Sequence, residues 1–230
     1  MAIVVITGAN RGIGLELARA YAQAGDRVFA FCRSPGDAAN LDDLTRASGG
    51  KLTVHAMDVA DGASVSAAAA VVGDAPVDIL INNAGVSGGR ATSLEGVDFE
   101  DWVETLNVMI VGPFRVVRAF LPNLAAAAGA RVMTVSSQMG ASTWPMGGAY
   151  PYVSAKAGVN RAMKSLALDL KARDIVVSVI HPGWVRTDMG GASADLSPEE
   201  SAAGIHKVIA DLTMADTGKF YKWNGDIHPW

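Results

Sequence analysis

The sequence is poor in the residues that mark several classes of protein. Its single cysteine, Cys32, excludes an internal disulfide and is typical of a reducing compartment, so we expect a cytoplasmic protein. No Cys/His cluster has the spacing of a zinc site, and we predict no metal. The formal net charge is −4 and there is no basic run, which argues against nucleic acid as a partner.

Long apolar runs are also missing. No stretch reaches the roughly 18 residues that a transmembrane helix needs. Residues 2–7 are apolar but lack a basic leader and continue into a glycine-rich segment, so we interpret them as a buried strand and not as a signal peptide. We therefore expect no membrane partner.

Half of the 230 residues are apolar, which is enough for one substantial core. Apolar runs of strand length alternate with helical stretches, a pattern typical of a parallel sheet between two helical layers. We predict an α/β fold: a single domain over residues 1–230 with a Rossmann-type, doubly wound parallel sheet of about seven strands and helices on both faces. The expected strands are 2–7, 27–32, 51–57, 77–82, 131–136, 175–181 and 219–222, and the expected helices are 12–24, 41–47, 63–72, 99–121, 152–172 and 198–210.

A glycine-rich turn follows the first expected strand and opens the first expected helix. Gly8 permits a tight turn, Gly12 lets the main chain approach a pyrophosphate, and Gly14 lets the helix pack closely on the strand. Phosphates are favoured at a helix N-terminus because free N–H groups and the helix dipole attract anions. The turn therefore predicts a dinucleotide site, with contacts from Gly8, Asn10, Arg11, Gly12, Ile13 and Gly14.

The end of the second expected strand carries an arginine and no acidic residue. An acidic residue there would bind the ribose 2′-hydroxyl, whereas an arginine receives a 2′-phosphate. Arg33 holds this place, and Arg11 in the glycine turn is a second cation that could reach the same phosphate. We predict NADP(H) in preference to NAD(H). The alternative is that both arginines are solvated surface groups.

Polar and small residues follow the third and fourth expected strands. Asp58 could accept a hydrogen bond from an adenine amino group while Val59 packs on the ring, although a plain helix N-cap would suit the neighbouring Asp61. After the fourth strand we place Asn83 beside the cofactor, whereas a structural role explains Asn82 at least as well. The predicted contacts at this strand end are Asn83, Ala84 and Gly85.

Tyr152 and Lys156 lie four residues apart at the start of a long expected helix, so they share one face. An ammonium beside a phenol lowers the pKa of the phenol, which could then exchange a proton with a carbonyl or alcohol oxygen. Upstream, Ser136 and Ser137 end a strand, where a hydroxyl could hydrogen-bond a reacting carbonyl. The sequence has no Gly-x-Ser-x-Gly motif, which argues against a serine hydrolase.

Asn107 lies within the expected helix 99–121 among apolar residues. A buried amide must find partners. A local kink that holds a water is one solution, and such a water could pass protons to Lys156. The alternative is a core amide that is satisfied within the protein.

A strand-breaking Pro-Gly pair follows the sixth expected strand. Pro182 and Gly183 turn the chain over the expected nicotinamide position, where the main chain at Val185 and the hydroxyl of Thr187 could bind the carboxamide. We interpret His181 as structural. The flexible segment and helix that follow are predicted to form a small substrate lid around residues 186–212.

As a set, these motifs resemble the short-chain dehydrogenase/reductase family. The resemblance spans the chain and rests on Thr7-Gly8-x-x-x-Gly12-x-Gly14, Asn82-Asn83-Ala84-Gly85, Asn107, Ser137, Tyr152-x-x-x-Lys156 and Pro182-Gly183. Residues 183–191 and 226–230 resemble, more narrowly, the C-factor/sniffer-type carbonyl reductase branch, which is associated in part with intercellular signalling.

The resemblance implies a role for each catalytic candidate. Tyr152 would be the general acid for ketone reduction, and Lys156 would lower the pKa of Tyr152 and hold the nicotinamide ribose. Ser137, which stands three residues before Gly140 as in the usual Ser-x-x-Gly turn, would orient the carbonyl, and Asn107 would complete a proton relay. The cofactor contacts implied are the glycine turn, Arg33, Asp58, Val59, Asn83, Ala84, Gly85, Tyr152, Lys156, Pro182, Gly183, Val185 and Thr187.

The function that we predict is that of an NADPH-dependent carbonyl reductase, which transfers a hydride between NADP(H) and a small-molecule carbonyl or alcohol. The alternative is a dinucleotide-binding signalling or regulatory protein in which reduction is incidental. The resemblance further implies a homodimer or homotetramer, with helices 99–121 and 152–172 paired across a two-fold axis.

Overall fold

A single sheet of seven parallel strands organises the computed structural model, which describes residues 1–89, 91 and 93–230. The strand order is β3-β2-β1-β4-β5-β6-β7, so the direction of winding reverses between β1 and β4. Ligands bind beyond the carboxyl ends of strands at such a reversal. The strands are β1 (Ile3–Thr7), β2 (Arg27–Cys32), β3 (Leu52–Ala56), β4 (Ile79–Asn82), β5 (Arg131–Val135), β6 (Val176–His181) and β7 (Phe220–Lys222).

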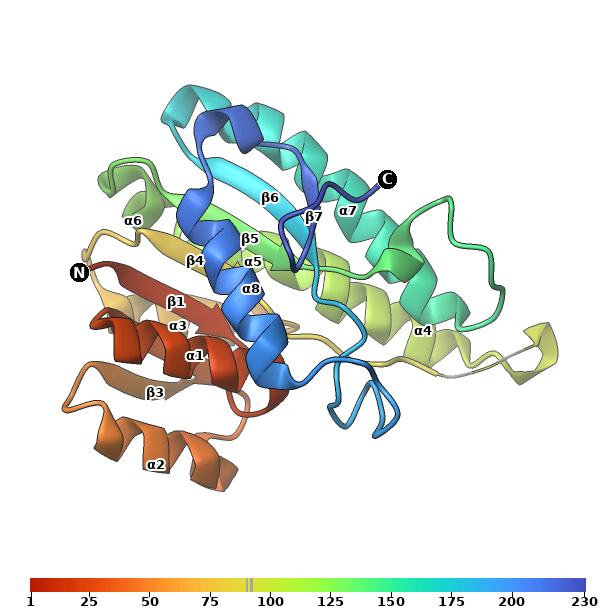
Figure 1. Cartoon of the computed structure of the whole chain (residues 1–230), viewed down its shortest axis with the longest axis horizontal. Helices are drawn as coiled ribbons and strands as arrows, with labels where there is room; N and C mark the ends of the chain where they lie inside the picture. Colours follow the sequence, from red (N-terminus) through yellow and green to blue (C-terminus); the bar gives the residue numbers. More distant parts are fainter. Residues whose placement is uncertain (90, 92) are drawn as a thin grey trace.

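Helices cover both faces of the sheet, as Figure 1 shows, and the predicted doubly wound α/β fold is confirmed. Helices α1, α2 and α8 pack on one face around a buried apolar cluster, and α3, α5 and α7 pack on the other. The helices are α1 (Gly12–Ala24), α2 (Ala39–Ala47), α3 (Gly62–Val72), α4 (Phe99–Leu106), α5 (Gly112–Ala119), α6 (Leu121–Ala126), α7 (Tyr150–Leu170) and α8 (Pro198–Asp211).

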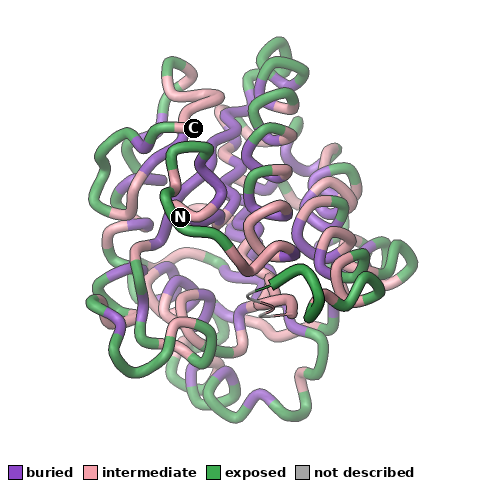
Figure 2. Tube along the Cα trace, turned by 90° about the vertical axis from the view of Figure 1, so that its right-hand side faces the viewer, coloured by how far each residue is buried: buried purple, intermediate pink, exposed green. Residues whose placement is uncertain are grey.

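The sheet is buried on both sides because its strands consist of apolar residues with almost no interruption. Every residue of β6 is buried, and so are four of the five residues of β1. The tube in Figure 2 shows the buried residues gathered in the interior, with exposed residues on the outer turns of the helices. This burial explains why continuous apolar runs, without polar alternation, predicted the strands.

The expected helix 99–121 is interrupted. It divides into α4, a π-helical turn at Asn107–Val111, and α5, and the short α6 follows Phe120. In the π-turn the main-chain N–H of Gly112 donates to the carbonyl of Asn107. A π-turn inserts an extra residue and displaces the helix axis, so the kink expected at Asn107 is present in this form.

Helix α8 starts at Pro198, as the sequence predicts. Ser197 caps it in a capping box, in which its hydroxyl accepts from the N–H of Glu200 while the Glu200 carboxylate accepts from the N–H of Ser197. Ala202, Ile205 and Ile209 bury one face of α8 against α1 and the sheet. No helix in the described residues is long and apolar enough to cross a membrane.

The chain folds back beside the outer edge of β7. The N–H of His228 donates to the carbonyl of Phe220, and the N–H of Lys222 donates to that of Asp226, each at 2.7 Å. The rings of His228 and Trp230 then pack on Phe220, with centroids 4.6 and 5.5 Å from its own. Residues 226–230 therefore cover an edge strand that would otherwise present unpaired main-chain groups.

Candidate active site

The turn between β1 and α1 requires glycine at three positions. Gly8 and Gly12 have positive φ angles of 65° and 53°, which residues with a Cβ rarely adopt. A Cβ on Gly8 would lie 2.8 Å from the Cα of Ala84, and a Cβ on Gly14 would collide with the carbonyl of Gly8 and the amide of Asn83. The glycines thus bring the β1 turn, the start of α1 and the end of β4 into direct contact.

Hydrogen bonds from Thr7 and Asn83 hold the ends of β1 and β4 together. The Thr7 hydroxyl accepts from the N–H groups of Asn83 and Ala84 at 3.1 and 3.0 Å. The side-chain amide of Asn83 donates to the carbonyls of Thr7 and Gly8 at 3.1 and 2.9 Å. Asn82 is buried, and its amide lies 3.4 Å from the hydroxyl of Thr134 on β5, in keeping with the structural role considered for it. This bracing role of Thr7 was not predicted, although a hydroxyl at the last position of a strand was the available signal.

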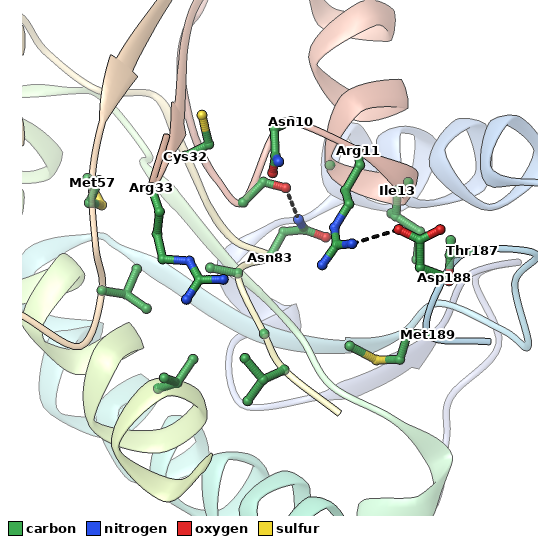
Figure 3. Close-up of a pocket in the computed structure, with 18 of the residues that line it drawn as sticks. Asn10, Arg11, Ile13, Cys32, Arg33, Met57, Asn83, Thr187, Asp188 and Met189 are labelled. Atoms are coloured by element: carbon green, nitrogen blue, oxygen red, sulfur yellow. Dashed lines mark hydrogen bonds and ion pairs between the residues drawn. The ribbon is translucent and has the colours of Figure 1, made fainter. Parts of the chain in front are cut away.

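A cleft of about 590 Å³ opens at the winding reversal, beyond the carboxyl ends of the strands. Figure 3 shows the side chains that converge on it from the β1 turn, the ends of β2 and β3, and the loop after β6. The predicted cofactor residues that line it are Gly8, Asn10, Arg11, Gly12, Ile13, Gly14, Arg33, Asp58, Val59, Asn83, Ala84, Gly85 and Thr187.

Several lining residues were not predicted as cofactor contacts. Most of them stand beside a predicted contact in the sequence, or fall within the predicted lid 186–212, as Pro198 of α8 does. Val108 comes from the π-turn, for which no cofactor contact was predicted. These residues are Cys32, Ser34, Met57, Val86, Val108, Arg186, Asp188, Met189 and Pro198.

The two predicted phosphate-binding arginines differ in their surroundings. The guanidinium of Arg11 donates to the carboxylate of Asp188 at 2.6 Å, and this pair joins the glycine turn to the loop after β6. Within the described residues Arg33 has no ion pair, and Figure 3 shows its guanidinium directed into the cleft. The structure therefore presents Arg33 ready for an anion, whereas Arg11 is already engaged by a carboxylate.

Asp58 and Asp61 take different positions after β3. The Asp58 carboxylate accepts from the N–H of Ala60 at 2.9 Å, and the residue lines the cleft together with Val59. Asp61 caps α3, with its carboxylate accepting from the N–H of Ala63 at 2.8 Å. The capping role considered for this segment thus belongs to Asp61, which leaves the other carboxylate facing the cleft.

Ser137, Tyr152 and Lys156 meet at one point. The hydroxyl of Ser137 lies close enough to the Tyr152 phenol to lower the pKa of that phenol, and the Lys156 ammonium lies 5.6 Å from the centre of the Tyr152 ring. Lys156 is buried and donates to the carbonyl of Val135 at 2.9 Å. A Cβ on Gly85 would lie 4.0 Å from the Lys156 Nζ, so this cluster adjoins the cleft that Gly85 lines. The hydroxyl of Ser136 is buried and has no hydrogen-bond partner in the described part of the chain.

Burial has the largest effect on the pKa values of Tyr152 and Lys156. It raises the pKa of the Tyr152 phenol, and the hydrogen bond with Ser137 lowers that pKa by less. Burial also lowers the pKa of the Lys156 ammonium to about 8. The sequence predicted a lowered phenol pKa from the neighbouring lysine. Desolvation works in the opposite direction, because the lysine is buried and the phenol is half-buried in the packed protein.

The side chain of Asn107 is directed toward the loop before α3. Its side-chain amide lies 3.5 Å from the carbonyl of Ala60, beside the loop that leads into α3. The residue is half-buried and not fully enclosed as the apolar context suggested. The π-turn that it begins does pack against α7, which carries Lys156. The structure therefore brings the main chain of this turn toward the lysine, and the side-chain amide points elsewhere.

The loop after β6 separates its predicted residues into structural and cleft-lining groups. The Pro182 carbonyl accepts from the hydroxyl of Ser201 on α8 at 2.6 Å. Gly183 has a φ of 86°, and a Cβ there would lie 3.1 Å from the Trp223 ring. Val185 is buried and pairs with Leu196. These three residues shape the loop, and among the predicted loop contacts Thr187 lines the cleft.

The predicted lid 186–212 has two parts. Residues 186–197 form the loop beside the cleft, held by the Arg186 guanidinium, which donates to the carbonyls of Ala194 and Asp195 at 3.0 and 2.9 Å. The second part is α8, which is packed on α1 as a core helix. His181 lies at the foot of this region, buried with its ring 5.6 Å from that of His228.

Comparison with known proteins gives the family of the chain. Residues 2–196 match the family model described as short chain dehydrogenase. The chain belongs to the short-chain dehydrogenase family. This dehydrogenase is 43% identical to the C-signal protein of Myxococcus xanthus over 156 residues, which are 67% of this chain and 93% of that one.

Two solved structures resemble the dehydrogenase over its whole length. The carbonyl reductase Sniffer of D. melanogaster is 30% identical with a TM-score of 0.91, covering 100% of this chain and 99% of that one. The NADPH-bound carbonyl reductase from chicken fatty liver is 32% identical with a TM-score of 0.90, covering 100% of both chains. The predicted family is thus confirmed, and with it the enzyme class, an oxidoreductase that acts on alcohol and carbonyl groups.

Proposed function

We propose that the protein is an NADPH-dependent carbonyl reductase of small molecules. The observation that carries the proposal is the placement of Ser137 and Lys156 on either side of Tyr152, at the edge of the glycine-turn cleft. A phenol beside a serine hydroxyl and an ammonium, next to a dinucleotide site, is suited to proton transfer at a carbonyl oxygen. A protein that only binds a dinucleotide has no need of such a group.

The residues of the cleft fit NADPH. Gly8 and Gly14 let the turn pack directly on Ala84 and Asn83 at the cleft, and the free N–H groups at the start of α1 favour a pyrophosphate. Arg33 fits a 2′-phosphate because it points into the cleft without an acidic partner in the described residues. The chicken enzyme, which the chain resembles over its full length, has NADPH bound. When bound, this cofactor supplies the hydride.

The protein's own residues would then control the proton and the carbonyl. Tyr152 gives its phenolic proton to the carbonyl oxygen during reduction and takes one from the alcohol during oxidation. Ser137 donates a hydrogen bond to the same oxygen and so stabilises the charge that develops there. Lys156 stabilises the phenolate left behind, because its ammonium is held on the same face of α7. The proposed proton relay is a water held at the kink that Asn107 begins, which would pass protons to this lysine.

The test is NADPH consumption, followed by absorbance, with a panel of small aldehydes and ketones. Tyr152→Phe removes the proton donor and keeps the ring, so kcat should fall by a factor of about 10² to 10⁴. Tyr150→Phe is the matched control, since Tyr150 lies on the same helical turn but stacks on Trp102, with centroids 6.3 Å apart. Retention of most turnover by Tyr152→Phe, with NADPH still bound, would overturn the proposal.

The second candidate is a dinucleotide-binding regulatory protein, favoured by the 43% identity to the C-signal protein. It requires that NADPH bind with full affinity while no carbonyl compound in the panel is reduced at a useful rate. Wild-type turnover that depends on Tyr152 decides for the enzyme. Homodimer or homotetramer formation and residence in the cytoplasm stay predictions, which light scattering and cell fractionation would check.

A further inference from the structure

The helix that carries Tyr152 and Lys156 begins without a cap of the usual kind. Ala149 stands at the cap position, where its methyl group cannot accept from the free N–H groups of the first turn. Its φ of 50° lies in the left-handed region, which a residue with a Cβ rarely adopts. Tyr152 is the third residue of this helix, so its position depends on whatever holds the uncapped turn.

Helix α4 provides a hydrogen bond to this turn. The indole N–H of Trp102 donates to the hydroxyl of Ser154 at 2.8 Å, and that hydroxyl donates to the carbonyl of Tyr150 at 2.6 Å. A hydroxyl has one proton and two acceptor sites, so it can make both bonds at once. The two bonds connect α4, which lies beside the start of α7 in Figure 1, to the residues that stand two positions before and two positions after Tyr152.

Ring contacts fix the direction of the indole. The Trp102 ring is stacked on Tyr150 and on Phe99, with centroids 6.3 and 6.2 Å apart. Aromatic rings attract one another at such separations, and the two contacts restrict rotation of the Trp102 side chain. The N–H is therefore held toward Ser154 by packing as well as by its own hydrogen bond.

The loop after β4 packs on the same turn. Gly88 has a φ of 62°, and a Cβ there would lie 2.9 Å from the hydroxyl of Thr105 on α4 and 3.1 Å from the Cβ of Pro151 on α7. The N–H of Ala149 donates to the carbonyl of Ala91 in this loop at 3.0 Å. Contacts with two other segments of the chain thus take the place of a cap at the start of α7.

Two pairs of residues alternate along the start of α7. Tyr150 and Ser154 are four residues apart and share one face, as Tyr152 and Lys156 share another. A step of two residues turns the helix by about 200°, so the pair that contacts Trp102 lies almost opposite Tyr152 and Lys156. Contacts on one side therefore determine how far the helix is rotated about its axis, and with it the direction of the Tyr152 phenol.

We propose that Trp102 is a positioning residue for the reaction, which acts through Ser154 to set the rotation of the first turn of α7 and so the place of the Tyr152 hydroxyl. The phenol must come within hydrogen-bond reach of the carbonyl oxygen, and a small displacement slows proton transfer. Trp102 is not among the described residues that line the cleft, so substitutions there should leave cofactor affinity unchanged. The effect on the reaction rests on the proposed reductase function, whereas the contact with Ser154 does not.

Hydrogen exchange tests the contact itself without an assay of activity. Trp102→Phe keeps an aromatic ring and removes the indole N–H, and Ser154→Ala removes the acceptor. In each variant the main-chain amides of residues 153–157 should exchange about three- to tenfold faster, because one net hydrogen bond no longer holds the turn. Amides of residues 160–168, further along the same helix, should keep their wild-type rates. Unchanged exchange over residues 153–157 would refute the proposal.

Steady-state kinetics test the consequence for the reaction. Both variants should lower kcat by about three- to tenfold and change the KM for NADPH by less than about twofold. Proton transfer from Tyr152 should also become slower relative to the other steps, so the solvent deuterium isotope effect on kcat should increase. A variant that merely contained less folded protein would show a lower kcat with an unchanged isotope effect, and that result would contradict a positioning role.

A double-mutant cycle shows whether the two side chains act as one unit. If Trp102 acts through Ser154, the double variant should have about the same kcat as the less active single variant, whereas independent effects would multiply. Ser165→Ala is the control for the serine, because Ser165 is exposed on the same helix. Trp230→Phe is the control for the tryptophan, because its ring packs on Phe220 at the edge of the sheet. Both controls should retain the wild-type kcat, and effects that multiply or equal losses in the controls would overturn the assignment.

Light scattering separates positioning from assembly, because α4 and α7 belong to the segments that are expected to pair between subunits. Both variants should have the molar mass of the wild type at the concentrations used for kinetics. A variant that dissociates as it loses activity would mean that Trp102 acts through a subunit interface, and the proposal would be wrong.

The outcomes also distinguish this proposal from the proposed function. A wild-type protein that reduces no carbonyl compound in the panel refutes the reductase and with it the positioning role, while hydrogen exchange still decides whether the contact holds the turn. A working reductase whose kcat is unchanged in both variants refutes the role of Trp102 alone.

Discussion

The two ends of the cleft are built by opposite means. At the dinucleotide end the binding surface is mostly the main chain of the turn at Gly8, Gly12 and Gly14, with exposed arginines at its rim. The reaction end adjoins the cleft and consists of side chains: Ser137 follows β5, and α7 carries the half-buried Tyr152 and the buried Lys156. The difference teaches that substitutions at the first end should act on cofactor affinity, and those at the second end on turnover.

The sharpest separation of the two ends comes from the adjacent serines. Ser137→Ala should lower kcat by a factor of about 10² to 10³, because a hydrogen bond to the developing charge is lost. Ser136→Ala removes a buried hydroxyl that has no partner in the described residues and should change kcat by less than about threefold. Steady-state kinetics with saturating NADPH measure both. Similar losses of kcat in the two variants would contradict the assignment of Ser137 as the serine that binds the carbonyl.

A buried histidine at the end of β6, outside both ends of the cleft, should make the fold sensitive to acid. Burial, followed by the nearby His228 and Lys222, lowers the pKa of His181 to about 4 from its usual 6.5. Below pH 6.5 the unfolded chain takes up the proton first, so stability is lost as the pH falls from about 6.5 to about 4. The loss amounts to about 3 kcal/mol.

His181→Gln should remove most of this acid dependence. Urea unfolding of the wild type and the variant between pH 7 and pH 4 would show it, as a shallower fall in the free energy of unfolding for the variant. Parallel curves for the two proteins would mean that other groups titrate and that His181 is not held neutral.

At the dinucleotide end, Arg33 should control the choice of cofactor. Arg33→Glu should raise the KM for NADPH by about 10- to 100-fold and leave kcat almost unchanged, because a charge-assisted hydrogen bond to the 2′-phosphate is replaced by repulsion. The KM for NADH should change little. Arg46→Glu on α2 is the control, since Arg46 is exposed and does not line the cleft. An unchanged KM for NADPH in Arg33→Glu would refute the cofactor assignment.

The smallest effect is expected at the pair formed by Arg11 and Asp188. The two side chains are 64% and 76% exposed, so the pair is worth at most about 1 kcal/mol. Asp188→Asn frees the guanidinium for a phosphate and should lower the KM for NADPH by less than about fivefold at low salt. The difference should vanish near 1 M salt, where the screening length is about 3 Å. A larger change in the KM for NADPH, or one that does not depend on salt, would mean that the substitution alters the loop after β6 and not the charge available at Arg11.

The strands and the glycine turn could be predicted because local sequence determines them. Apolar runs bounded by turns gave the seven strands and their parallel arrangement, and the turn at Gly8–Gly14 reads as a dinucleotide motif from its spacing and place alone. Tyr152 and Lys156 were likewise brought together by helical periodicity. In each of these cases the partners are close in the chain.

What the sequence could not supply depends on contacts between distant segments. Arg11 is paired with a residue 177 positions away, so its engagement is invisible in the local motif. The direction of the Tyr152 pKa follows from how deeply α7 is packed, and spacing says nothing of that depth. At Asn107 an apolar context predicted a buried amide in one helix, whereas a π-turn redirects both the amide and the helix axis.

The packing of α8 on α1 decides how the protein can open and close. Because α8 is packed in the same core as the start of α1, this part of the predicted lid is not free to move as a rigid body over the cleft. The segment beside the cleft that lies outside this helix runs from Gly183, whose φ is 86°, to the cap at Ser197. Loops of this length move within nanoseconds to microseconds, faster than whole domains. We therefore expect that admission of the cofactor involves a local adjustment of this loop and no movement of a domain.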